Sequence, residues 1–243
     1  MAQASLYVAK LFTRGVDAAM PRILPFVLFM AFIALESLIR WLAGLAHASE
    51  TAPASTLLWL YPLRTVVVLG ALLCLWPAYQ ELRDTLCSNI REALLVIVVG
   101  VLVYVAWVRM DWSWAMQGQP TGYDPFQAGP GVGVVLAAIR LFGAVIVVPV
   151  MEELFWRSFL IRYIETTAFT TARLGTFTPL SFGATVVLFG LEHHLWLAGM
   201  LAGAAYNLIL YKTRRLWPCI LAHALTNLLL GIHVLVTGEW HWW

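Results

Sequence analysis

Two adjacent carboxylates and an arginine, Glu152, Glu153 and Arg157, stand inside an apolar stretch of the chain. On a helix, Glu153 lies four residues before Arg157, an order that favours an ion pair between them. Glu152 is turned about 100° away from its neighbour, so we expect it to face the interior of a helical bundle alone. Desolvation and the adjacent carboxylate both disfavour its charged form, which suits a general base that activates water. The alternative interpretation is a structural charge cluster near the cytoplasmic end of a helix.

Two further polar islands follow in equally apolar surroundings, and each consists of two residues four positions apart. Phe189 and His193 share one helix face, as do His223 and Asn227. An asparagine amide in a dry pocket can donate to a developing oxyanion, and a histidine can do the same or position the water. The alternative for each residue is a satisfied core group or a hydrogen bond between helices. Three such islands of the residue types used in hydrolysis favour one shared catalytic site.

The composition is that of a polytopic membrane protein. Of the 243 residues, 61% are hydrophobic and only 12% are charged, whereas soluble domains carry about 45–50% apolar and about 25% charged residues. The net charge of +2 comes without a basic stripe, so we expect no nucleic-acid partner. Three widely spaced cysteines indicate neither a disulfide framework nor a thiolate metal site. The chain has no HExxH motif, which argues against a zincin-type protease.

Apolar runs long enough to cross a bilayer predict helices at Ile23–Leu42, Leu57–Trp76, Ile90–Trp107, Val132–Met151 and Leu216–Val236. A further apolar stretch at 181–211 is interrupted by the sequence Glu-His-His at 192–194. Each half reaches only ~22 Å at 1.5 Å per residue, less than the ~30 Å hydrocarbon core. We therefore predict an all-α, polytopic transmembrane bundle of about 7–8 membrane helices, with a short broken hairpin around 181–211.

Other charged residues in these segments are assigned structural roles. Glu36 and Arg40 are four apart in the first span and are expected to pair. Arg140 lies within a span and needs a partner that the sequence does not identify. Glu192 and His194 face away from His193 on a continuous helix and are the weaker candidates, although a turn at this point weakens that argument.

The organisation expected is a single transmembrane domain, residues 1–243, with its catalytic core at 145–230. Residues 1–20 are predicted to form an interfacial helix, because apolar residues recur at helical spacing beside Lys10 and Arg14. The excess of basic residues in alternate loops places the N-terminus in the cytoplasm. The use of alanine and arginine, with only two lysines, indicates a bacterial protein of the inner (cytoplasmic) membrane.

The three islands together resemble the three motifs of the CPBP intramembrane protease family. Those motifs are matched here by Glu152-Glu153-x-x-x-Arg157, Phe189-x-x-x-His193 and His223-x-x-x-Asn227. The family groups the type II CAAX prenyl endopeptidases with bacteriocin-processing and self-immunity proteins, and some members look similar to proteins that accompany exosortase systems. The resemblance extends over about Val145 to Leu230.

The resemblance implies a membrane-embedded endopeptidase in which Glu152 and His193 activate a water molecule. Glu153 and Arg157 would support the site and Phe189 would line it. His223 and Asn227 would stabilise the tetrahedral oxyanion. It implies no cofactor and no metal, with zinc held by Glu152, His193 and His223 as the alternative.

The expected partners are a protein or peptide substrate in the membrane and the bilayer itself. Two other classes of function fit the same residues. A proton-coupled transporter would use the carboxylates and histidines as a relay. A non-catalytic membrane chaperone or immunity factor would not need them for chemistry.

Overall fold

The computed structural model describes residues 18–45, 51–118 and 122–243, without the side chains of 51–56. The predicted interfacial helix at 1–20 falls almost entirely outside these residues. The described part of the chain is helical and contains no strand, which confirms the all-α class.

Five helical segments of the described residues are long and apolar enough to cross a membrane: Met20–Leu45, Leu57–Ala78, Ile90–Trp107, Pro130–Tyr163 and Trp217–Thr237. They confirm the five predicted spans and support an integral membrane protein. The corresponding helices are α2 (Met20–Leu45), α3 (Thr51–Leu75), α4 (Ile90–Trp107), α5 (Pro130–Phe142) continued by α6 (Val148–Glu153) and α7 (Ile161–Tyr163), and α10 (Trp217–Thr237). With the two hairpin helices they make seven in the described part, in line with the predicted number.

The fourth span is longer than the predicted Val132–Met151, because it continues to Tyr163. The hydropathy falls where Glu152 begins, but a helix does not have to end there when its polar side chains find partners within the bundle. Two π-helical segments, Gly143–Val147 and Leu154–Leu160, interrupt the α-helical geometry of this span. The first precedes Pro149, which lacks the N–H needed for a regular helical bond. Such π-helical segments are frequent at functional sites.

The broken hairpin is confirmed. Helix α8 (Pro179–Leu191) and helix α9 (Trp196–Thr213) are joined by the turn at 192–195. Two glycines let the helices meet closely, because a Cβ at Gly190 would lie 2.6 Å from the Trp196 carbonyl oxygen and one at Gly199 would lie 3.0 Å from the Gly190 Cα. The turn itself is held by Gln117, whose side-chain amide donates to the carbonyl oxygens of Leu191 (2.7 Å) and His193 (2.9 Å).

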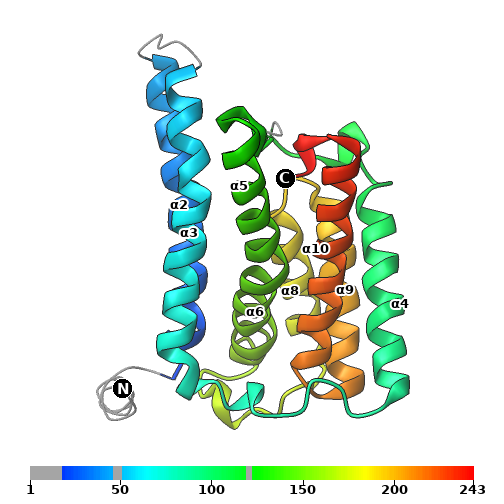
Figure 1. The fold of residues 1–243 in the computed structure, drawn as a ribbon. Helices are drawn as coiled ribbons and strands as arrows, with labels where there is room; N and C mark the ends of the chain where they lie inside the picture. The colour runs from blue at the N-terminus through cyan, green and yellow to red at the C-terminus, as the bar shows by residue number, and fades with distance from the viewer. Residues whose placement is uncertain (1–17, 46–50, 119–121) are drawn as a thin grey trace. The chain divides into compact units, whose positions relative to one another are not determined.

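The chain divides into two compact units, whose described parts are treated separately. Unit 1 comprises residues 1–78 and 123–143, and unit 2 comprises 79–122 and 144–243. In unit 1, α2 and α3 lie side by side along their length (Figure 1). In unit 2, α4 and α10 pack closely, since a Cβ at Gly100 would lie 2.9 Å from the Ala222 carbonyl oxygen. The prediction of one domain with its catalytic core at 145–230 stays a prediction.

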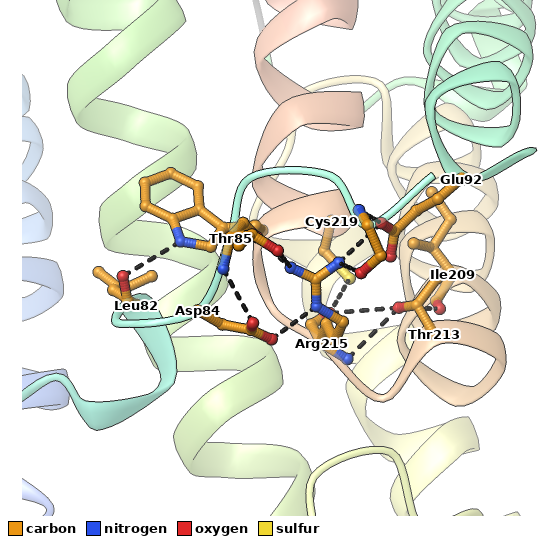
Figure 2. Close-up of polar contacts among 10 residues, drawn as sticks. Leu82, Asp84, Thr85, Glu92, Ile209, Thr213, Arg215 and Cys219 are labelled. Carbon is orange, nitrogen blue, oxygen red and sulfur yellow. Dashed lines mark hydrogen bonds and ion pairs between the residues drawn. The ribbon is translucent and has the colours of Figure 1, made fainter. Parts of the chain in front are cut away.

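Arg215, just before α10, forms hydrogen bonds with the segment that leads into α4 in unit 2 (Figure 2). The guanidinium donates to Asp84 Oδ2 (2.6 Å), Glu92 Oε2 (2.7 Å) and Thr85 Oγ1 (2.8 Å). The Trp217 indole N–H donates to the Leu82 carbonyl oxygen at 3.2 Å. These bonds fix the helix that carries His223 and Asn227.

Candidate active site

A buried arginine organises the region around the first island. Arg157 is 1% exposed and donates to Glu153 Oε1 at 3.1 Å, which gives the predicted ion pair. Its remaining hydrogen bonds, both 3.2 Å long, go to the Asn207 side-chain oxygen and the Gly203 carbonyl oxygen on α9. The guanidinium carbon also lies 4.4 Å from the centre of the Phe189 ring. Arg157 therefore joins its own helix to α8 and α9.

Glu153 also orients His223, a contact that the sequence did not predict. The Nδ1 atom of His223 lies 3.0 Å from the same oxygen, Glu153 Oε1. A carboxylate accepts hydrogen bonds, so Nδ1 carries the proton, and Nε2 of the neutral ring keeps its lone pair. Tyr206 stacks on this imidazole at 5.1 Å between centroids, and its hydroxyl donates to Thr226 Oγ1 at 2.9 Å. The ring of His223 is thus fixed on two sides.

His193 is held in the matching tautomer. Its Nδ1 lies 2.7 Å from the Phe189 carbonyl oxygen, which can only accept, so Nδ1 donates and Nε2 is the acceptor. The Phe189 ring lies 4.8 Å from the His193 ring and 6.3 Å from the His223 ring, measured between centroids. Trp107 contacts the other side of His193 edge-on at 5.2 Å. The structure therefore brings the second and third islands together around one phenylalanine.

Glu152 has a different environment from Glu153. It is 4% exposed and takes part in no ion pair among the described residues, and its Oε2 atom, like that of Glu153, is buried without a hydrogen-bond partner among them. The charge of Glu192 acts on Glu152 more strongly than the charge of its neighbour Glu153 does. From the sequence, Glu192 is a weaker candidate than His193 because it faces away from His193 on a continuous helix, and the turn found here removes that argument. The Glu-His-His break, which predicted the turn, was the signal that could have identified it.

Asn227 is placed by a contact of its own. Its side-chain N–H donates to the Ala144 carbonyl oxygen at 2.8 Å, in the π-helical segment about two turns before Glu152. An amide has two N–H donors, so one is left for another acceptor. Among the described residues, no three His, Cys, Asp or Glu side chains are arranged to hold a metal ion.

Residues 134–229 match the family model described as type II CAAX prenyl endopeptidase Rce1-like. This confirms the resemblance predicted from the three motifs, and all three motifs lie within the matched stretch. The match supports a membrane protease of the CAAX type in general. No curated protein and no solved structure matched the chain.

Proposed function

We propose that this chain, with its Rce1-like stretch at residues 134–229, is an intramembrane endopeptidase that hydrolyses a peptide bond of a membrane-associated protein or peptide. The observation that carries the proposal is the contrast between two adjacent carboxylates. Glu153 Oε1 is bonded to Arg157 and His223, whereas Glu152 takes part in no ion pair among the described residues, and its Oε2, like that of Glu153, is buried without a hydrogen-bond partner among them. A buried polar atom without a partner is costly for the fold, and in a catalytic site it is the atom that meets water.

The proposed reaction uses Glu152 as the general base. Glu152 takes a proton from water as the water oxygen bonds to the carbonyl carbon, and His193 Nε2 accepts the second hydrogen bond of that water. The carbonyl oxygen becomes an oxyanion, which the remaining N–H of Asn227 stabilises. When the carbon–nitrogen bond breaks, the proton held by Glu152 passes to the leaving amine.

Glu153 and Arg157 are positioning residues in this scheme. Glu153 holds the His223 ring through Nδ1 at 3.0 Å and so fixes its position beside the proposed oxyanion. Arg157 forms an ion pair with Glu153 at 3.1 Å and so fixes the carboxylate that orients His223. Phe189 separates the two imidazoles and lines the site.

The proposed setting is a bacterial inner membrane with the N-terminus in the cytoplasm. The excess of basic residues in alternate loops supports this orientation. The substrate class follows from the same setting, because a site within the spans meets peptides that are already in the bilayer.

The test is cleavage of a fluorogenic membrane peptide by the purified chain in nanodiscs. Glu152→Gln keeps the size of the side chain but removes its basicity, and we expect a loss of about 10²–10⁴ in kcat. The matched control is Glu36→Gln, which changes a carboxylate in another span that pairs with Arg40 at 2.8 Å. Cleavage by Glu152→Gln at the wild-type rate, with the unfolding curve unchanged, would refute the general base.

One observation favours a second candidate, a proton-coupled transporter. The charge of Glu192 acts on Glu152, and carboxylates within a bundle can form a proton relay. Uptake into liposomes driven by a pH gradient, abolished by Glu192→Gln and without any proteolysis, would establish this function in place of hydrolysis.

A further inference from the structure

Four hydrogen bonds connect Gln117, in the segment after α4, to the turn between α8 and α9. Its side-chain amide donates to the carbonyl oxygens of Leu191 (2.7 Å) and His193 (2.9 Å). Its backbone N–H donates to the His194 carbonyl oxygen at 2.9 Å. The Nδ1 atom of His194 donates in return to the Gln117 carbonyl oxygen. One residue therefore supplies donors to three carbonyl groups of a turn that lies 74 to 77 residues further along the chain.

These bonds matter because the turn interrupts a helix. In a continuous helix each carbonyl group accepts a bond from the residue four positions on, but the carbonyl groups at the end of α8 have no such partner. A carbonyl group left without a partner in apolar surroundings is costly. A single exposed hydrogen bond contributes little, since water can replace it, whereas four bonds from one residue fix the path of the main chain. Gln117 thus determines where the main chain of the turn lies.

The path of this main chain decides where the His193 imidazole lies. The ring is bonded through Nδ1 to the Phe189 carbonyl oxygen at 2.7 Å, and Trp107 on α4 contacts it edge-on at 5.2 Å. On the side of α9, a Cβ at Gly199 would lie 3.3 Å from His193 Nδ1. Because three helices pack against the ring, rotation of the side chain cannot compensate for a displaced main chain. A shift of the turn is therefore passed on to Nε2.

A second contact joins the same segment to the hairpin. Trp114 lies edge-on to Trp196, the first residue of α9, at 6.2 Å between ring centroids. Trp114 and Gln117 both precede residues 134–229, the stretch that matches the family model. The support for His193 therefore comes from a part of the chain outside the family match.

We propose that Gln117 is a positioning residue for His193. By holding the turn, it keeps Nε2 of His193 in place for the water that Glu152 activates. The role in hydrolysis rests on the proposed endopeptidase activity. The orientation of the ring is a property of the chain itself, and it can be measured without a substrate.

The first test is nitrogen NMR of the full chain in nanodiscs, labelled with ¹⁵N-histidine. Gln117→Met keeps the length of the side chain and the backbone bonds but removes both amide donors. We expect the wild type to show one His193 tautomer, with the proton on Nδ1, and Gln117→Met to shift this signal and to show both tautomers. The signal is assigned by its absence in His193→Gln. His223, which Glu153 holds at 3.0 Å, is the internal control, and its signal should not change.

The second test is cleavage of the fluorogenic membrane peptide. Small displacements of a group that contacts the reacting atoms are expensive for the chemical step, so we expect Gln117→Met to lower kcat by about tenfold to a hundredfold. KM should stay within about twofold, because uniform binding of the substrate is not affected. The matched control is Gln127→Met, which changes an exposed glutamine before α5. It should resemble the wild type in kcat and in both histidine signals.

The outcomes separate this proposal from the proposed proteolysis. An unchanged His193 signal in Gln117→Met would overturn the proposal, as would a kcat equal to that of Gln127→Met in a chain that cleaves. Equal changes at His193 and His223, with a lower unfolding midpoint, would show a general loss of structure and would also overturn it. If the wild type cleaves no peptide, the proteolysis fails, but the His193 signal still decides whether Gln117 positions the ring.

Discussion

Arg157 in unit 2 and Arg64 in unit 1 are both buried in apolar helices, but only one of them is fully paired. Arg157 donates to Glu153, Gly203 and Asn207. Arg64 lies between the rings of Phe29 and Tyr61, and its Nε atom has no partner among the described residues. The same side chain therefore occurs once in a completed network and once in an incomplete one.

The difference lies in the groups that surround each guanidinium. A charge inside a membrane bundle is expensive unless it is paired. Around Arg157, the chain itself supplies the carboxylate, and the network in turn orients His223. Around Arg64, the described residues supply the aromatic faces of Phe29 and Tyr61, and the Nε atom has no hydrogen-bond partner among them. Arg157 therefore orients a second side chain through its carboxylate partner, whereas Arg64 bonds to no carboxylate among the described residues.

The comparison of Arg157 with Arg64 is tested most strongly by replacing each arginine with methionine. The larger effect is expected for Arg157→Met. Methionine leaves Glu153 buried without its neutralising partner, and we expect a loss of about 3–5 kcal/mol in the free energy of unfolding. Reversible unfolding in mixed micelles measures it. The control is Arg173→Met, which changes an exposed arginine outside the spans. A loss at Arg157 no larger than at Arg173 would contradict the role of the network.

The substitution Arg64→Met should have the opposite sign. It removes a buried guanidinium whose Nε atom has no hydrogen-bond partner among the described residues, and we expect no loss of stability or a gain of about 1 kcal/mol. A loss as large as that of Arg157→Met would show that Arg64 has a structural partner, and the comparison would fail.

Much of the fold could be predicted because a membrane helix satisfies its own backbone. The five spans followed from hydropathy, and the ion pairs Glu153–Arg157 and Glu36–Arg40 followed from their spacing within one helix. The predicted end of the fourth span was wrong, because a hydropathy scale does not show whether polar side chains find partners inside the bundle. Spacing within a helix is local information, and it was reliable where the partners are local.

The candidate site was harder to predict from the sequence, because its contacts join distant parts of the chain. His223 and Glu153 are 70 residues apart, and no periodicity relates them. The Tyr61 ring under Arg140 comes from another helix, so the sequence could show that Arg140 needs a partner but not which one. The position of Glu192 near Glu152 depends on the geometry of a turn, which the sequence located but could not orient. The catalytic roles of the motif residues stay predictions.

A third arginine, Arg215, separates the effect of pairing from that of burial. The expected change in the free energy of unfolding is smallest here. Arg215 is bonded as fully as Arg157, but its partner Asp84 is half exposed, at 51%. The hydrogen bond from Arg215 lowers the pKa of Asp84. A carboxyl group with a lower pKa in the folded state stabilises it at pH values above the unfolded pKa of about 3.9. That contribution is lost as the pH falls through the folded pKa.

We therefore expect Asp84→Asn to lower the free energy of unfolding by less than about 1 kcal/mol at pH 7, because exposed pairs are screened by water and salt. The deficit relative to the wild type should shrink at acidic pH, where the wild-type carboxyl group is also neutral, and in high salt. Unfolding at both pH values measures it, with Asp111→Asn as the control for an exposed acid. If Asp84→Asn were as damaging as Arg157→Met, or equally damaging at both pH values, then the number of hydrogen bonds rather than the exclusion of water would explain why Arg157 matters.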